Sequence, residues 1–299
     1  MALYAFDGTG NEDRPDTAEG GFDSNVLAFF RAYHDPDKDL QETNDRGSLY
    51  LKGVGRRAET HTGSVVAQAF GLGGHLRIGI MMDRLAHNCD AGDTTIDVVG
   101  FSRGAALAVS FANEVARKLP MLRIRFLGVW DIVGEFGLPG RFVNAGHDLT
   151  LPSNATRCHH AMALDEARTV FQLTRLCGTG RDEAERLLEV WFRGVHSDVG
   201  GGNGNFGLNW ITLDWMYAAA IRAGLPIDPA AVIANRVHGA LAMDIHEHSH
   251  AIGPKRHILA ADLLHTSVVL DRSVRHHQRN DPAVPLRRAT NEGMILPAV

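Results

Sequence analysis

The stretch TIDVVGFSRG, residues 95–104, decides the fold of this 299-residue chain. It begins as a β-rich run and leads into an alanine-rich segment of helical period, which Pro120 is expected to stop. Gly100, Ser102 and Gly104 match the pattern G-x-S-x-G, in which a serine lies at the apex of a tight turn from strand to helix. Glycine is needed on both sides because larger side chains would collide with neighbouring elements. The stretch therefore predicts a strand, a strained turn at Ser102 and a helix.

The rest of the chain alternates short apolar runs with segments of helical period, which is typical of βα units around a mostly parallel sheet. Strands are expected at residues 3–6, 48–52, 95–101, 124–130 and 188–195. Helices are expected at residues 25–33, 65–87, 104–118, 164–176 and 213–223. We therefore expect an α/β fold in which helices cover both faces of the sheet, giving three layers.

One domain is expected over residues 1–299, because no internal repeat or low-complexity tract divides the chain. Residues 226–299 are expected to form a helical or irregular region that covers the rest. After residue 271 the chain is polar, arginine-rich and interrupted by prolines, which favours an irregular surface tail.

The composition excludes several classes of protein. With 44% hydrophobic and 22% charged residues and a net charge of −5, the chain is globular and has no basic field for nucleic acid. Its three cysteines suit reduced thiols rather than a disulfide framework. The first residues contain no signal peptide, and no apolar segment is long enough to span a bilayer. We expect a cytoplasmic protein, or one exported without a cleaved signal.

A serine hydroxyl needs a base, and the base needs an acid that orients it. Asp131 directly follows one expected strand and His196 follows the next, so both lie where the carboxyl edge of a parallel sheet is expected. The chain order Ser102, Asp131, His196 is the order found in α/β-hydrolases. His265 also follows the acid in the sequence and is a rival base, or a residue that lines the site.

Two backbone segments are candidates for an oxyanion hole. The N–H of Arg103 lies at the start of the expected helix, and the loop with Gly8 and Thr9 follows the first strand. Asp7 could instead bond its own backbone in an Asx-type turn, and the two interpretations are compatible.

Metal chemistry is the alternative at two places. The sequence HEHSH that starts at His246 contains H-E-x-x-H, so His246 and His250 could bind zinc with Glu247 as base and His257 or Asp262 as third ligand. Histidines are dense in this part of the chain, so a chance match is easy. A calcium ion at Asp198, beside a run of three glycines, lacks support from ligand spacing. We therefore expect no metal and no cofactor.

Four motifs together resemble the bacterial α/β-hydrolase-like domain of type VI secretion lipase effectors. They are FDGTGN at 6–11, GFSRGAA at 100–106, GVWDIVG at 128–134 and EVWFRGVHSDVGGG at 189–202. The resemblance covers residues 3–225. It implies an α/β-hydrolase-like fold and phospholipase or related carboxylic ester hydrolase activity.

Carried over to this sequence, the resemblance implies Ser102 as nucleophile, Asp131 as acid and His196 as base. Effectors of the family are usually longer and carry a membrane-binding extension, and Arg193 stands where the family often has proline. The expected function is that of a serine esterase or phospholipase-like hydrolase that forms an acyl-enzyme. Its expected partner is a small-molecule or lipid ester, with peripheral membrane contact as an expectation of lower rank. The alternative from another class is a catalytically inactive hydrolase fold used as a binding module.

Overall fold

The computed structural model describes residues 1–9, 23–53, 63–134, 147–176, 185–203, 207–238, 244–246, 253–270 and 279–298. Within these residues nine strands form one sheet in the order β2-β1-β3-β4-β5-β6-β7-β8-β9. The strands are β1 (Ala2–Phe6), β2 (Leu49–Leu51), β3 (Ile96–Phe101), β4 (Ile124–Trp130), β5 (Cys158–Ala163), β6 (Leu187–Phe192), β7 (Leu263–His265), β8 (Arg287–Ala289) and β9 (Ile295–Leu296). All neighbouring pairs are parallel except β8 and β9.

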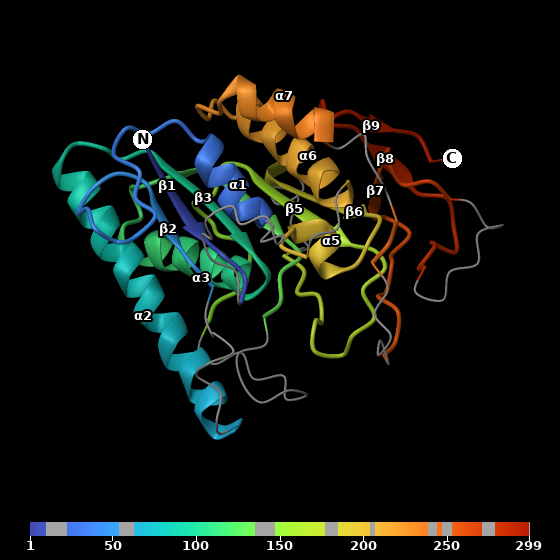
Figure 1. Ribbon diagram of the computed structural model, residues 1–299, viewed down its shortest axis with the longest axis horizontal. Coiled ribbons are helices and arrows are strands. Elements are labelled where there is room, and N and C mark those ends of the chain that lie inside the picture. Colours follow the sequence, from blue (N-terminus) through green and yellow to red (C-terminus); the bar gives the residue numbers. More distant parts are fainter. Residues whose placement is uncertain are drawn as a thin grey trace.

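Helices cover both faces of this sheet (Figure 1). They are α1 (Asn25–Ala32), α2 (Gly63–Asp90), α3 (Ser102–Lys118), α5 (His196–Gly200), α6 (Leu208–Arg222) and α7 (Pro229–His238). Helices α2 and α3 pack on one face, and α1 and α6 pack on the other. The fold is the expected α/β sandwich of three layers with a mostly parallel central sheet.

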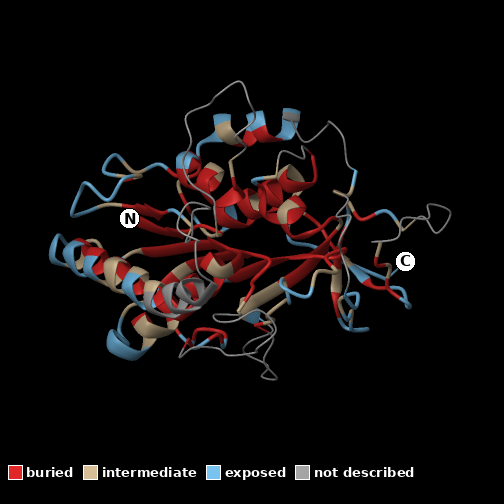
Figure 2. Ribbon diagram, turned by 60° about the horizontal axis from the view of Figure 1, so that its bottom comes forward, coloured by how far each residue is buried: buried red, intermediate tan, exposed pale blue. Residues whose placement is uncertain are grey.

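Strand β1 shows how the sequence builds two cores. Tyr4 and Phe6 belong to the core beneath α2 and α3, whereas Leu3 and Ala5 belong to the core beneath α1 and α6. This alternation follows from the two-residue period of a strand, and a strand between two helical layers is therefore apolar throughout. Figure 2 shows the buried layer along the central strands of the sheet, whereas β9 at the end of the sheet is exposed.

Two expectations about local structure are wrong. Residues 164–176 form turns and irregular backbone instead of a helix. The buried carboxylates of Asp165 and Glu166 accept hydrogen bonds from the backbone N–H groups of Gly194 and His196, so tertiary contacts fix this segment. Residues after 271 are not wholly irregular, because β8 and β9 extend the sheet.

Within the described residues, the region 226–299 contains α7 and contributes β7, β8 and β9 to the sheet. Cys89 and Cys158 are free thiols, and Cys177 lies outside the described residues. Among the described helices, none combines the length and apolar character that crossing a membrane requires.

Candidate active site

Ser102 lies at the junction of β3 and α3. Its φ of +59° is in the left-handed region, which residues other than glycine rarely adopt. A Cβ at Gly100 would lie 2.7 Å from Cα of Ala105, and a Cβ at Gly104 would lie 2.4 Å from the carbonyl oxygen of Phe6. The predicted strained turn is confirmed, and close packing requires both glycines.

A hydrogen-bonded chain joins the serine to the two other predicted side chains. Asp131 directly follows β4 and has a φ of +41°, and His196 is the first residue of α5. Nε2 of His196 lies 2.8 Å from Oγ of Ser102, and Nδ1 lies 2.6 Å from Oδ2 of Asp131. The three residues therefore come from separate connections and meet at the carboxyl edge of the sheet, with the geometry needed for proton transfer.

Two aromatic rings hold the imidazole of His196. The ring centroids of Phe101 and Phe171 each lie 4.6 Å from that of His196. Phe101 in turn fills the space above Gly200, where a Cβ would lie 2.0 Å from the ring. Substitution of Gly200 would therefore displace a ring that orients the histidine.

Arg256 is the main electrostatic partner of Asp131. Its two terminal nitrogens lie 2.5 and 2.9 Å from the two carboxylate oxygens, and they also donate to the carbonyl oxygens of Ala163 and Phe171. Burial of Asp131 opposes its ionisation, but Arg256 and His196 together hold its pKa below the ordinary value. Asp131 is therefore an ionised acceptor, which requires Nδ1 of His196 to donate the hydrogen bond.

The pKa of His196 is lowered, and burial is the largest cause. The hydrogen bond to Asp131 raises this pKa and the charge of Arg256 lowers it, so the net direction remains downward. A histidine with a lowered pKa is neutral at pH 7, and its Nε2 can accept the proton of Ser102.

Asp7 holds the loop beside the turn in place. Its carboxylate accepts hydrogen bonds from the Gly8 N–H at 2.6 Å, from Ser24 Oγ at 2.5 Å and from Tyr50 Oη at 2.6 Å. Asp7 does bond the local backbone, although to the N–H of the next residue rather than two residues on as in an Asx turn, and this bond engages the Gly8 N–H that was a candidate oxyanion donor. Within this loop, the N–H of Thr9 is the better candidate.

The other candidate donor is the N–H of Arg103, in the first turn of α3, where backbone N–H groups have no acceptor within the helix. The carbonyl of Asp7 packs against Gly104, which places the loop that holds Thr9 beside this turn. The Arg103 side chain is largely buried, which lowers its pKa to about 10.

Asp198 has a structural role in the described residues. Its carboxylate accepts hydrogen bonds from the backbone N–H groups of Val195 and His246 and from the Asn203 amide, at 2.9 to 3.0 Å. It thereby ties the start of α5 to the distant segment at His246. These neighbours are donors, not the oxygen ligands that calcium requires.

His265 is not brought to Ser102. It lies in β7, stacks on Phe192, and its ring nitrogens pair with Oγ of Ser267 at 2.8 Å and Oδ1 of Asn291 at 2.7 Å. In this arrangement His196, and not His265, lies within hydrogen-bond distance of Ser102.

The zinc alternative falls partly outside the described residues, which exclude Glu247 and His250. Of the other candidate ligands, His257 is exposed and Asp262 is held by Arg175 and by the indole N–H of Trp191.

Sequence reasoning missed three residues that support this site. Arg256 clamps the carboxylate, Glu166 accepts a hydrogen bond from the His196 N–H, and His160 Nε2 accepts from the N–H of Ile132, next to Asp131. Each acts across the sheet edge on a residue far away in the sequence, so no local pattern marks the contact. For Glu166 a signal was available, because its segment ALDEAR at 163–168 is itself similar to the family.

Residues 3–118 and 114–219 match the family described as "T6SS, Phospholipase effector Tle1-like, catalytic domain". The chain belongs to this family. A Tle1-like catalytic domain is a hydrolase domain, in agreement with the fold and with the resemblance noted in the sequence.

Three other proteins show similarity. An uncharacterized protein from Pseudomonas aeruginosa has a solved structure with a TM-score of 0.57, 23% identity, and coverage of 81% of this chain and 48% of that chain. The structure of the Tle1 effector bound to the VgrG spike of the type 6 secretion system has a TM-score of 0.45, 23% identity, and coverage of 67% of this chain and 50% of that chain. An uncharacterized protein of Saccharomyces cerevisiae is 33% identical over 100 residues, which are 29% of this chain and 15% of that protein. This Tle1-like chain thus spans about half the length of the two solved chains.

Proposed function

We propose that the protein is a serine hydrolase that cleaves carboxylic esters, with phospholipids as the substrate class. The observation that carries the proposal is the hydrogen-bonded chain from Ser102 through His196 to Asp131, with distances of 2.8 and 2.6 Å. Membership of a phospholipase effector family supports the substrate class. We call these three residues the triad.

In the first step, Oγ of Ser102 attacks the ester carbonyl while Nε2 of His196 takes its proton. Asp131 accepts the Nδ1 hydrogen bond throughout and stabilises the imidazolium. The N–H groups of Arg103 and Thr9 donate to the oxyanion. His196 then gives its proton to the leaving alcohol, and an acyl-enzyme is formed.

In the second step, water takes the place of the alcohol. His196 removes a proton from the water as it attacks the acyl carbonyl, and returns that proton to Oγ of Ser102 when the acid leaves. Arg256 fits this scheme because it keeps Asp131 ionised although Asp131 is fully excluded from solvent.

A fluorophosphonate probe tests the proposal directly, because it forms a stable bond to an activated serine. We expect the wild-type protein to be labelled and Ser102→Ala not to be. Ser110→Ala is the matched control, since Ser110 is a buried serine of the same helix α3, and it should be labelled like the wild type. Absence of wild-type labelling would favour the inactive binding module, and equal labelling of Ser102→Ala would refute the assigned nucleophile.

We further infer that the protein is exported by a type VI secretion system, as its family description suggests. The test compares culture supernatants of the source strain and of a strain that lacks a functional secretion sheath. The protein should be present only in the first. Equal amounts in both supernatants would contradict this route.

A further inference from the structure

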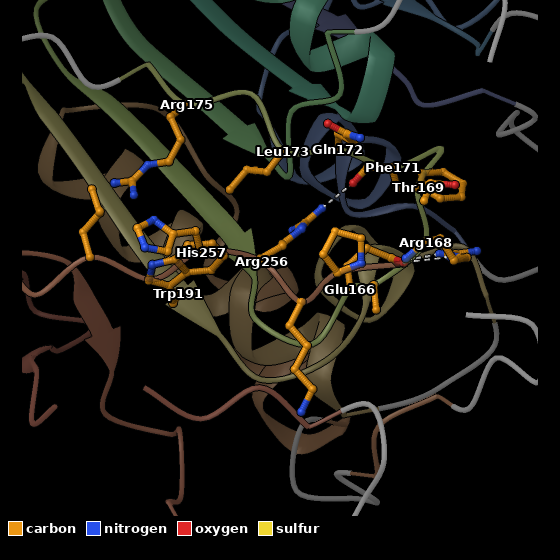
Figure 3. A pocket seen from close by; sticks show the side chains of 14 residues that line it. Glu166, Arg168, Thr169, Phe171, Gln172, Leu173, Arg175, Trp191, Arg256 and His257 are labelled. Carbon is orange, nitrogen blue, oxygen red and sulfur yellow. Dashed lines mark hydrogen bonds and ion pairs between the residues drawn. The ribbon is translucent and has the colours of Figure 1, made fainter. Parts of the chain in front are cut away.

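A cavity of about 410 Å³ lies beside the triad. It is formed between the loop that follows β5 and the segment that leads into β7, and Trp191 of β6 contributes to its wall (Figure 3). In that view Arg175, His257 and Trp191 lie on one side of Arg256, and Glu166 and Phe171 lie on the other. None of the proposed chemical steps uses this cavity.

Three residues that line the cavity are in contact with residues of the triad. Phe171 packs on the His196 ring, Glu166 accepts a hydrogen bond from the His196 N–H, and Arg256 pairs with Asp131. A molecule held in the cavity would thus be separated from the imidazole by the thickness of one aromatic side chain.

The described lining of the cavity is cationic. Arg168, Arg175, Lys255 and Arg256 contribute to it, and Glu166 is the one carboxylate among the described lining residues. Carboxylates outside the lining also pair with these groups, Glu189 and Asp262 with Arg175 and Asp131 with Arg256. Lys255 instead donates to the carbonyl oxygen of Arg279, so its positive charge would attract an anion.

The arginines also face the cavity more than their acidic partners do. The side chains of Arg168 and Arg175 are each 21% exposed, but Glu166 is 1% exposed, and Glu189 and Asp262 are each 4% exposed. The carboxylates therefore lie behind the guanidinium groups, and the guanidinium groups form the accessible surface. Guanidinium groups bind phosphate with paired hydrogen bonds, so an exposed set of them favours that anion.

The remaining wall combines apolar side chains with the polar side chains of Thr169, Gln172 and His257. Phe171, Leu173, Trp191 and Leu259 contribute to it. A cavity with cationic groups and apolar side chains suits an anion that is attached to an amphiphile. In a glycerophospholipid the phosphate and the nearest ester are separated by a few bonds.

We propose that this cavity binds the phosphate of a glycerophospholipid while one of its esters lies at Ser102. The proposal rests on the hydrolase function proposed above and names the part of the substrate that the protein recognises. The cavity thereby favours phospholipids over neutral esters of the same acyl length.

The test uses Lys255→Glu, because Lys255 is exposed and lies outside the triad and its direct contacts. Lys118→Glu is the matched control, since Lys118 is an exposed lysine at the far end of α3. The substrates are monomeric dihexanoyl-phosphatidylglycerol and the neutral ester p-nitrophenyl hexanoate. For Lys255→Glu we expect about a tenfold loss of kcat/KM on the phospholipid, mainly through KM, and less than a twofold change on the neutral ester. Lys118→Glu should change neither.

A binding measurement separates this proposal from the proposed function. In the Ser102→Ala background, which cannot turn over, dihexanoyl-phosphatidylglycerol should bind about tenfold more weakly when Lys255→Glu is added. Inorganic phosphate should inhibit the wild-type enzyme on the phospholipid but not on the neutral ester. Equal effects of Lys255→Glu on both substrates, no effect on either, or equal inhibition of both reactions by phosphate would overturn the cavity proposal. Failure of the wild type to cleave either ester would instead refute the hydrolase function.

Discussion

Two serines of helix α3 are each hydrogen-bonded to a buried histidine from another part of the chain. Only one of these serine–histidine pairs has the other features of a hydrolytic site. Ser102 pairs with Nε2 of His196 at 2.8 Å, and Ser110 pairs with Nδ1 of His147 at 3.1 Å. All four residues are nearly excluded from solvent. A serine–histidine hydrogen bond is therefore not enough to identify an active site.

The two pairs differ in what surrounds the histidine. The second nitrogen of His196 bonds Asp131, whereas His147 stacks on the ring of His75 at 4.5 Å. Burial, followed by the charge of His75, lowers the pKa of His147 to about 4. An imidazolium formed at His147 would therefore be disfavoured, whereas one formed at His196 would be stabilised by a carboxylate.

The two pairs also differ in backbone. Ser110 lies in the middle of α3, where backbone N–H groups bond to carbonyls one turn earlier. Ser102 lies at the helix start with a strained φ of +59°, next to N–H groups that have no acceptor within the helix. The turn and the acid, more than the serine–histidine contact, therefore distinguish the proposed site.

The largest expected effect is a loss of kcat on substitution of His196 that substitution of His147 or His265 does not cause. His196→Ala should lower kcat on p-nitrophenyl hexanoate by about 10⁶-fold, which is the scale of base removal in another serine hydrolase. His147→Ala and His265→Ala should keep activity within about twofold, although both will lower the melting temperature because they empty buried space. Loss of activity in folded His147→Ala comparable to that in His196→Ala would contradict the assignment.

A smaller effect is expected at the acid. Asp131→Asn should lower kcat by about 10⁴-fold, because an amide favours the wrong tautomer of His196 and leaves the imidazolium without its counter-charge. The control is Asn291→Asp, which would give His265 a carboxylate partner without moving it toward Ser102. That variant should not rescue His196→Ala, and rescue would show that His265 can be the base.

The smallest of these effects concerns pH. Activity needs neutral His196, and its lowered pKa predicts that the acidic limb of the wild-type profile lies below the ordinary histidine value of 6.5. Since Arg256 is one cause of the lowering, Arg256→Gln should raise the pKa of His196 and move this limb to higher pH. It should also lower kcat by up to about 100-fold through misplacement of Asp131.

Arg256→Lys is the matched control, because it keeps the charge and loses the paired hydrogen bonds. Its acidic limb should stay near that of the wild type while kcat falls. If the limb of Arg256→Gln does not move in the pH dependence of kcat/KM, the charge of Arg256 does not lower the pKa of His196.

The features of the proposed site that could be predicted from the sequence are those with local signals. Strand β3, the turn at Ser102 and helix α3 are marked by glycines and by a change of period, and Asp131 and His196 each follow an apolar strand. Strand β5 was missed because its sequence, CHHAMA, contains no β-branched residue, and its burial comes from neighbouring strands. Strands β7, β8 and β9 have two or three residues each, so their pairing, rather than their composition, defines them.

Arg256 could not be predicted for a different reason. It meets Asp131 across a separation of 125 residues, and neither residue carries a pattern that refers to the other. The same holds for residues 164–176, which form a loop instead of the expected helix. The carbonyl oxygen of Phe171 in this loop accepts a hydrogen bond from Arg256. Contacts that only the completed fold creates leave no trace in a single sequence.

The position of Arg256 also determines how short a fragment of this chain can be and still be expected to have the proposed activity. The family match ends at residue 219, and the match contains the whole triad. An excised piece with those bounds would contain the proposed nucleophile, base and acid, yet it would lack the counter-ion of Asp131 and the strands β7 to β9. The family match thus ends before the set of residues that the proposed site needs, because that set extends at least to Arg256.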